Sequence, residues 1–442
     1  MKQILFLLLT LVTFGFFTYT MRRLYSYLTV TKNTYVIDRV GERIKHTLLV
    51  AFGQSKILRK PFAGALHATV YWGFLVITVG TVEIIFDGLL GTHRILSFLG
   101  PVYDFVTVSG EIFAVLIIIS VFIFLMRRHF FKPKRFIAPE MKPSSTTDAT
   151  VILFMIFLLM TSLLGMNMGH QAAAANGTGH ANPGFYPISD ALLGMISLGD
   201  SAHLVGEINW WIHIVLVYAF LNILPLSKHF HVILSIPNVF LSRLTPHGML
   251  LNLESVKKEV ALMMSDDPFA VDDDAGAEEE EIARFGIKDI EDASWKNVID
   301  SYTCTECGRC TASCPANITG KKLSPRKLYI DLRKRMATKG SELVKANASN
   351  EQYDDQKALV GDYITEEELW ACTTCGACMQ ECPVNIEHVP FIVSMRQYLV
   401  MEESSAPEAL NIMFNNIENN GAPWAMSPSA RLDWAQEIYM PE

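Results

Sequence analysis

All eight cysteines of the chain lie between Cys304 and Cys382, in two copies of one pattern. The first copy reads C-T-E-C-G-R-C-T-A-S-C-P, and the second reads C-T-T-C-G-A-C-M-Q-E-C-P. This doubled pattern restricts the fold more than any other feature, because each copy must form a tight turn that points three thiols at one place. Gly308 and Gly376 supply the permissive backbone that such a turn needs.

The run C-x2-C-x2-C-x3-C-P binds [4Fe–4S] clusters in bacterial ferredoxins. In proteins with two clusters, the fourth cysteine of each run ligates the cluster of the other run. We therefore predict two [4Fe–4S] clusters with crossed ligation. The ligands of the first are expected to be Cys304, Cys307, Cys310 and Cys382, and those of the second Cys372, Cys375, Cys378 and Cys314.

Two other uses of these cysteines are conceivable. A structural zinc site needs only paired C-x2-C knuckles, so the third cysteine and the trailing Cys-Pro of each run would have no purpose. Disulfides require an oxidising compartment, whereas the membrane topology derived below places the cysteines in the cytoplasm. The pattern therefore favours clusters over both alternatives.

The chain divides sharply in composition. Half of its 442 residues are hydrophobic, yet its formal net charge is −8. Residues 1–245 are apolar with basic connecting segments, whereas residues 246–442 are polar and hold the cysteines. We predict a mainly α fold in which a five-helix transmembrane bundle precedes a cytoplasmic α-helical ferredoxin domain. The expected boundaries are 1–245 for the bundle, 246–283 for an amphipathic and acidic linker, 284–400 for the ferredoxin domain and 401–442 for a C-terminal tail.

Five apolar runs are long enough to cross a bilayer, which takes ~20 residues. The first could instead be a signal peptide, but no small-x-small cleavage site follows it, and Arg22 and Arg23 come directly afterwards. We therefore expect a retained helix there. The predicted spans are residues 3–20, 63–86, 106–126, 149–168 and 209–227.

Charge in the connecting segments orients these spans. Lys and Arg are frequent between the first and second spans and between the third and fourth, whereas residues 169–208 contain neither. Because basic loops remain in the cytoplasm, we expect the N-terminus outside and the iron–sulfur domain inside. The expected location is the cytoplasmic membrane of a bacterium or archaeon, as a multi-pass protein.

Several shorter features are also predicted. We expect a short helix near residues 191–195 and an amphipathic run over 228–262. The acidic cluster 266–281 is expected to be a solvated linker. A helix that opens with proline is predicted for 325–337, and a capped helix for 365–370. The tail 403–442 is expected to be irregular.

Histidines in the apolar half are candidate ligands, because ionisable residues inside a bilayer are costly. His213 and His231 are eighteen residues apart. On one continuous helix this is five whole turns and ~27 Å, so both would share a face and lie near opposite membrane surfaces. His229 would point away from that face. His67, beside small residues near the inner start of the second span, could pair with His231 as the axial ligands of a b-type haem.

Leu66-His67, His213 and the segment 225–231 together resemble the cytochrome b (gamma) subunit of respiratory nitrate reductase and its relatives in heterodisulfide-reductase-like complexes. The resemblance implies one haem between His67 and His231 and a second that uses His213. In the family the second haem's other ligand lies further along the second span, where this chain has Thr81 and Glu83 and no histidine. His170 is the best substitute, and His203 and His93 are weaker ones.

The cysteine-rich half resembles the ferredoxin-like part of two known proteins, the D-type subunit of heterodisulfide reductase and the C-type subunit of glycerol-3-phosphate dehydrogenase. In many such proteins, modules with a Cys-Cys-Gly motif follow, and this sequence contains none. The chain also has no G-x-G-x-x-G after a strand and no thiol beyond the two cysteine runs. We therefore expect a chain that is not a complete enzyme by itself, and nothing in it points to nucleic acid.

The resulting hypothesis is a membrane-bound electron-transfer subunit. It would relay electrons between the quinone (menaquinone) pool and a cytoplasmic partner, either a Cys-Cys-Gly protein or a flavoprotein, through haem b and two [4Fe–4S] clusters. Two alternatives stay open. The chain could be a haem-free anchored ferredoxin that docks a soluble dehydrogenase, or a redox sensor whose clusters report rather than relay.

Overall fold

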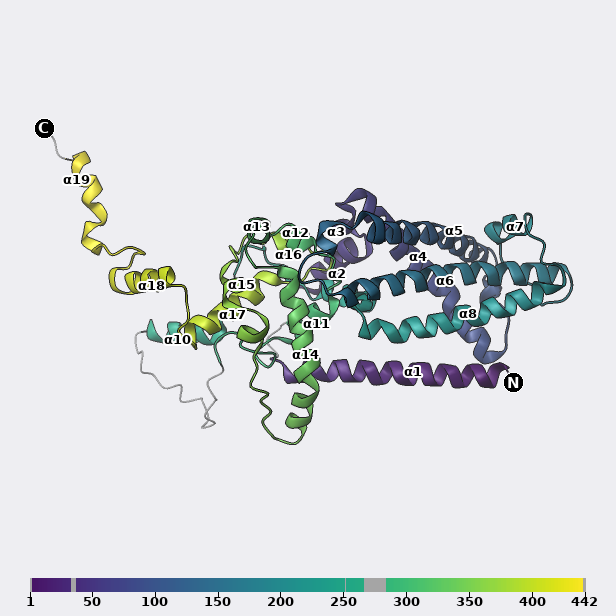
Figure 1. The fold of residues 1–442 in the computed structure, drawn as a ribbon, viewed down its shortest axis with the longest axis horizontal. Coiled ribbons are helices and arrows are strands. Elements are labelled where there is room, and N and C mark those ends of the chain that lie inside the picture. The colour runs from purple at the N-terminus through teal and green to yellow at the C-terminus, as the bar shows by residue number, and fades with distance from the viewer. Residues whose placement is uncertain (1, 33–36, 251, 266–283, 440–442) are drawn as a thin grey trace.

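A computed structural model describes residues 2–32, 37–250, 252–265 and 284–439. Helices make up the regular structure of these residues, and the only extended pairings described are two isolated β-bridges. Long apolar helices lie side by side at one end of the elongated molecule, and shorter helices that carry the cysteines form a second body beside them (Figure 1). The mainly α fold with its five apolar helices is thus confirmed.

Five helices in the described residues are long and apolar enough to cross a membrane, and each of them matches a predicted span. Pro opens three of them at the first position, where a missing backbone N–H costs nothing. Most continue beyond the predicted ends, because polar residues at the bilayer surface keep the helical conformation. These helices are α1 (Lys2–Ser26), α4 (Pro61–Leu90), α5 (Pro101–Met126), α6 (Pro143–Ala175) and α8 (Ala202–Ile223).

Glycines bring α6 and α8 close together in the centre of the bundle. A Cβ atom added at Gly169 would lie 2.3 Å from the backbone nitrogen of Gly206, and one added at Gly165 would lie 2.6 Å from Oδ1 of Asn209. Small residues let two membrane helices approach until their backbones touch. These two helices therefore form a rigid pair.

The expectation that one continuous helix carries both His213 and His231 is wrong. Helix α8 ends at Ile223, and the backbone at Ser227 is extended (φ −113°, ψ 158°). Pro225 cannot donate the hydrogen bond that would continue α8. His231 instead begins a new helix, α9 (His231–Phe240).

The cysteine-bearing body surrounds an apolar core between α11 (Trp295–Thr303), α14 (Pro325–Ala348) and α17 (His388–Met401). The predicted opening of α14 at a proline is confirmed, although the helix runs eleven residues further than expected. Helix α15 (Glu366–Trp370) has the predicted cap, in which Thr365 and Glu368 form a reciprocal capping box. Leu328, Leu332 and Met395 are fully buried in this core.

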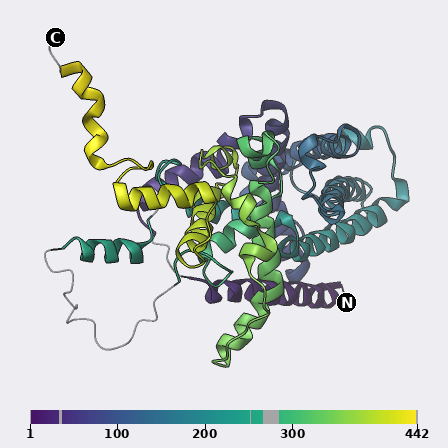
Figure 2. The same cartoon turned by 60° about the vertical axis from the view of Figure 1, so that its left-hand side comes forward.

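The end of the first span belongs to the same core. Tyr27 is 1% exposed and Val30 8%, and both pack with residues of the cysteine-bearing body. The chain then pairs with the segment before α11: the Lys32 N–H donates to the carbonyl of Ala293 at 2.9 Å, and the Trp295 N–H donates to the carbonyl of Lys32 at 3.2 Å. Figures 1 and 2 show α1 reaching α14 from the bundle side. The two halves of the molecule are therefore directly joined.

Outcomes differ among the shorter predicted features. The helix expected at 191–195 is α7 (Pro187–Leu193), and the run 228–262 contains α9 and α10 (Glu254–Met263). The prediction of an irregular tail is wrong, because α18 (Glu408–Asn420) and α19 (Asp433–Tyr439) occupy it and extend away from the main body (Figure 1). The segment 266–281 lies outside the described residues.

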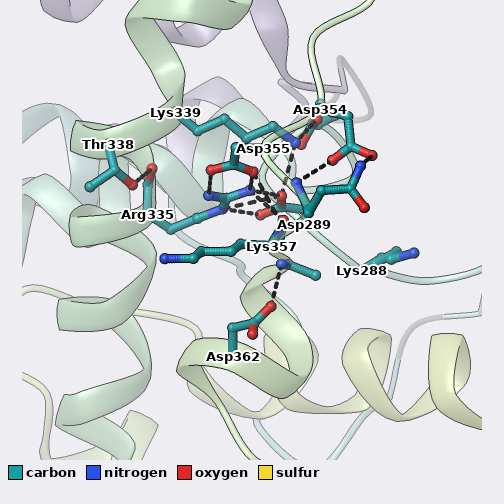
Figure 3. Close-up of polar contacts among 12 residues, drawn as sticks. Lys288, Asp289, Arg335, Thr338, Lys339, Asp354, Asp355, Lys357 and Asp362 are labelled. Carbon is teal, nitrogen blue, oxygen red and sulfur yellow. Dashed lines mark hydrogen bonds and ion pairs between the residues drawn. The ribbon is translucent and has the colours of Figure 1, made fainter.

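A buried ion cluster fastens the loop after α14 (Figure 3). The guanidinium of Arg335 is fully buried and donates to both Asp289 and Asp355, at distances between 2.6 and 3.1 Å. Lys339 donates to Asp289 at 2.9 Å and also contacts Glu291. The hydrogen bonds from Arg335 hold the pKa of Asp355 down at about 2. Three separate segments are thus held by one arginine.

We predict that Arg335→Ala destabilises the cysteine-bearing body by about 3–5 kcal/mol, because truncation leaves buried carboxylates without their partner. The measurement is the thermal unfolding midpoint of the purified protein in detergent. Lys345→Ala on the same helix is the control. Its ion pair with Glu342 is exposed, so its loss should leave the unfolding midpoint nearly unchanged. Equal midpoints for the two variants would contradict a structural role for Arg335.

Candidate functional site

The two cysteine loops share one backbone conformation. Glu306 and Thr374, each just before the second cysteine of its run, have φ of 56° and 55°. Gly308 and Gly376, each just after that cysteine, have φ of 71° and 74°. Left-handed residues on both sides curl the chain around a centre, and the glycines adopt this conformation without strain. The predicted need for glycine at these two positions is confirmed.

Short helices then carry the third cysteine of each run, α12 (Arg309–Ala312) in the first and α16 (Ala377–Glu381) in the second. The fourth cysteine of the first run does not stay with its own loop. Cys314 lines one pocket together with Cys372, Cys375 and Cys378. We call these four residues the distal set.

The other four cysteines, Cys304, Cys307, Cys310 and Cys382, also lie together and are called the proximal set. Burial raises the pKa of the Cys310 thiol, and Cys307, Cys382 and Cys304 are near enough for their charges to raise it further. Cys378 of the distal set acts on it as well. Burial raises the pKa of Cys304 to about 11 and that of Cys382 to about 12. A buried thiol becomes a thiolate only beside strong positive charge, and the irons of a cluster supply such charge.

Backbone amides face the sulfur atoms in both sets. The Ile386 N–H donates to Sγ of Cys382 at 3.3 Å, and the Thr374 N–H donates to Sγ of Cys372 at 3.3 Å. Such hydrogen bonds to cysteine sulfurs help to set the reduction potential of a cluster. The environment therefore contains donors that would tune a bound cluster.

The structure also describes the state and grouping of the thiols. All eight cysteines are free thiols. Within the described ranges, no group of three or more His, Cys, Asp or Glu side chains is arranged to hold a single metal ion. A [4Fe–4S] cluster differs from zinc in spreading its four thiolates over four irons, so it needs a wider cage.

The proximal set lies against the end of the helical bundle. Glu306, which stands between its first two cysteines, is 9% exposed and accepts hydrogen bonds from Ser145 at the start of α6 and from Arg333. Its carboxylate also lies 3.9 Å from Nζ of Lys228, beyond the end of α8. The first cysteine loop is thus fixed to two bundle elements.

A second set of contacts joins both cysteine runs to α3 (Ser55–Leu58). Arg309 donates to the carbonyl of Lys56 at 3.0 Å, and Lys56 donates to the carbonyl of Met379 at 3.2 Å. Cys310 and Cys378 belong to one buried cluster, so the two sets adjoin there. Cys375 of the distal set is exposed. The two sets therefore adjoin each other, and the distal set reaches the surface at Cys375.

The hydrogen bonding of His231 suits a ligand that binds through Nε2. Its Nδ1 lies 3.1 Å from the carbonyl oxygen of Lys228. A carbonyl can only accept a hydrogen bond, so Nδ1 carries the proton and Nε2 keeps its lone pair. Burial lowers the pKa of His231 to about 3, which keeps the ring neutral.

The predicted partner of His231 lies close to it. His67 is near enough to His231 for a proton on one ring to be felt by the other, and Nδ1 of His67 is buried without a hydrogen-bond partner among the described residues. Arg309 is the charged group that acts on His67, so this pair lies beside the proximal cysteines. His229 instead faces Ser227 at 2.9 Å and Asp148 at 3.5 Å. The donor chemistry at His67 and His231 thus fits the axial ligands of a haem.

The hydrogen bonding of His213 also suits a ligand. Among the residues that the structure describes, however, no second histidine lies opposite it to complete a bis-histidine site. Its Nδ1 lies 3.0 Å from the carbonyl of Leu159 and 3.2 Å from the hydroxyl of Ser162. Its Nε2 is buried and has no hydrogen-bond partner in the described ranges. His170 lies eight residues beyond Ser162 on α6, roughly 12 Å along the axis. The structure therefore does not bring His170 and His213 to the same level of the bundle.

The remaining outer candidates have other surroundings. The rings of His170 and His93 are 5.4 Å apart, and His203 is exposed. Where the resembled family has its second ligand, Glu83 accepts a hydrogen bond from Tyr103 at 2.9 Å and lies 3.7 Å from Arg94. At that level the described residues offer a buried ion pair beside a cavity whose lining includes no histidine, so this region does not fit a second bis-histidine haem.

Sequence reasoning missed the residues that join the two halves, which are Glu306, Arg309, Lys56 and Lys228. Arg309 could have been noted, because it lies inside the first cysteine run, next to Cys310. Glu306 lies inside the same run, next to Cys307, whereas Lys56 and Lys228 carry no such signal. Their role depends on which loops meet in three dimensions.

Comparison with known proteins agrees with the cysteine geometry. Residues 296–383 match the family model described as a 4Fe-4S dicluster domain. The chain therefore carries an iron–sulfur dicluster domain, together with five helices able to span a membrane. No solved structure matches the chain.

Three similar proteins extend the comparison. The probable iron-sulfur-binding oxidoreductase FadF of Bacillus subtilis is 31% identical over 99% of this chain and 61% of its own length. The EtfAB:quinone oxidoreductase of Syntrophomonas wolfei is 28% identical over 90% of this chain and 55% of its own length. A probable membrane-anchored ferredoxin of Chromohalobacter salexigens is 34% identical over 36% of this chain and 25% of its own length. The chain thus spans little more than half the length of the first two relatives. These similarities support electron transfer through iron–sulfur clusters.

We predict that Cys314→Ser damages the distal cluster rather than the cluster beside it in sequence. The anaerobic protein should lose about four of about eight irons, and its reduced spectrum should lose the same component as that of Cys375→Ser. Cys307→Ser, in the proximal set, is the matched control. If the Cys314 and Cys307 variants lose the same component, the ligation is not crossed.

Proposed function

We propose that this chain relays electrons between the membrane quinone pool and a cytoplasmic redox partner, through haem b and two [4Fe–4S] clusters. The observation that carries the proposal is the order of the candidate centres. The histidine pair, the proximal set and the distal set follow one another from the bundle to the exposed Cys375. Such an order is what a relay requires.

His67 and His231 would hold the haem, which supplies one-electron chemistry when bound. The surrounding chain supplies orientation. The carbonyl of Lys228 fixes the ring of His231, and the contact of Arg309 with α3 (Ser55–Leu58) holds the proximal cysteine loop against this end of the bundle.

The proposed orientation puts the N-terminus outside and the cysteine-bearing body in the cytoplasm. The basic segments after α1 and α5 lie at the end of the bundle that contacts this body, and the segment without Lys or Arg, 169–208, lies at the other end. Basic segments favour the cytoplasmic side. Reduced thiols and cluster assembly also belong there.

The similar proteins bear on both ends of the relay. One of them is an EtfAB:quinone oxidoreductase by name, which supports quinone at the membrane end and a flavoprotein at the soluble end. The partner, a flavoprotein or a Cys-Cys-Gly protein, would dock where the distal set reaches the surface at Cys375. A membrane-bound relay needs such a partner, because two clusters and a haem include no substrate pocket.

A haem-free anchored ferredoxin is the second candidate. The similarity of part of this chain to a probable membrane-anchored ferredoxin supports it. In this case the bundle would only hold the clusters near the membrane. The two candidates differ in a single measurable property, the presence of haem b.

We predict a b-type absorption spectrum in the dithionite-reduced protein. His67→Ala and His231→Ala should each remove the same haem, because axial ligation needs both rings. His229→Ala is the control and should retain it, because His229 contacts Ser227 and Asp148 instead. A pyridine haemochrome assay that finds no haem in folded protein with intact clusters would support the anchored ferredoxin.

A second measurement tests the relay itself. In lipid nanodiscs, a reduced quinol analogue should reduce both the haem and the clusters, and a soluble one-electron acceptor should then reoxidise them. His67→Ala should slow cluster reduction by quinol at least about tenfold while leaving reduction by dithionite unchanged. Unchanged quinol kinetics in this variant would show that electrons do not pass through the histidine pair.

A further inference from the structure

Three arginines surround one aromatic ring where α5 leaves the bundle. The guanidinium carbons of Arg127, Arg128 and Arg135 lie 5.9, 4.8 and 5.2 Å from the centroid of the Phe136 ring. Arginine stacks favourably on an aromatic face. The Phe136 ring therefore holds three guanidinium groups close together. We call Arg127, Arg128, Arg135 and Phe136 the Phe136 arginine cluster.

The charges of this cluster are not neutralised by the described part of the protein. Within the ranges that the structure describes, none of the three arginines forms an ion pair with a carboxylate. One terminal nitrogen of Arg128 and Nε of Arg135 are buried without a hydrogen-bond partner among those residues. The carboxylate whose charge acts on Arg128 is that of Asp148, which is already engaged by Ser227 at 2.7 Å and by His229.

Like charges held this close repel one another, and buried N–H groups without acceptors cost free energy. A cluster thiolate at Cys307 would act on Arg135 but not on the two arginines that follow α5. An anion between Arg135 and the two arginines at the end of α5 would remove both costs.

The surroundings of the cluster indicate where the anion comes from. Phe130 is 72% exposed, Phe131 78% and Ile137 65%, all within the same loop. These apolar side chains continue the lipid-facing surface of α5 to the level where phospholipid headgroups lie. Basic pockets at the ends of membrane helices bind anionic headgroups.

We propose that the Phe136 arginine cluster binds the phosphate of an anionic phospholipid, with Phe130 and Phe131 against its acyl chains. Two guanidinium groups can each donate paired N–H groups to phosphate oxygens. Phe136 holds the guanidiniums in place before the lipid arrives. This site is independent of the haem and of the direction of electron flow.

The site would connect lipid composition to the cysteine-bearing body. The carbonyl of Arg135 accepts a hydrogen bond from Arg326 at 2.8 Å, and Arg326 also donates to the carbonyl of Glu306. A lipid bound at the arginine cluster would therefore hold the loop that carries the proximal set. The expected role is to seat the iron–sulfur body on the membrane.

The test is lipid retention. Protein in nanodiscs of phosphatidylglycerol and phosphatidylcholine is exchanged into a neutral detergent with excess phosphatidylcholine, and retained lipid is counted by native mass spectrometry. Wild-type protein should keep about one phosphatidylglycerol, and the double variant Arg127→Gln, Arg128→Gln should lose it, with occupancy reduced at least about fivefold. Phe136→Leu, which keeps every charge, should lower the occupancy as well.

The matched control is Lys132→Gln with Lys134→Gln, which removes the same charge from exposed side chains of the same loop. It should retain the lipid. Equal loss in both double variants would show general surface attraction and overturn the site, as would no retained phosphatidylglycerol in wild-type protein. Displacement of the lipid by millimolar inorganic phosphate would show a free-anion site instead. Unchanged iron content and unfolding temperature establish that the variants are folded.

Discussion

The buried carboxylate of Glu306 is the interaction on which the arrangement of the molecule depends. It lies between the first two cysteines of its run and is bound from three directions, by Ser145 of α6, by Lys228 and by Arg333 of α14. A buried carboxylate is stable only when it is paired or hydrogen-bonded, so the positions of its partners determine the position of the first cysteine loop. The position that satisfies it places the proximal cysteines at the end of the bundle. Glu306 thereby attaches the cysteine-bearing body to the helical bundle.

The same end of the bundle shows how a membrane protein can combine polar chemistry with an apolar body. His67, His231, Lys56, Lys228 and the arginines that follow α5 all lie at the end of the bundle that contacts the cysteine-bearing body. Within the bundle, charge is confined to a few satisfied groups such as Glu83 with Arg94. Ionisable groups cost most at the bilayer centre, so the chemistry is concentrated at the boundary.

Much of this could be predicted because it is local. The turn at Gly308, the cap at Thr365 and the five apolar spans each depend on residues within a few positions of one another. The prediction of a continuous helix through His231 was wrong because Pro225 and the extended backbone at Ser227 interrupt the helix. Counting residues per turn does not detect such a local break. The docking through Glu306 and Arg309 could not be predicted, because it joins segments more than 75 residues apart. Ligation by Cys314 was inferred from the doubled motif alone, and the structure places Cys314 among the distal cysteines.

The insertion of Tyr27 and Val30 into the core beneath α14 has a consequence for biosynthesis. Each apolar side chain that becomes fully buried contributes roughly 1.5–3 kcal/mol, so the cysteine-bearing body lacks part of its core until α1 is in place. The chain emerges from the ribosome with α1 ahead of the cysteines, and that helix can enter the bilayer before they are made. The cysteine-bearing body then folds against the end of the first span, which is already anchored in the membrane. Its assembly is templated by the first span, and a cysteine-rich half made without that span would begin with a gap in its core.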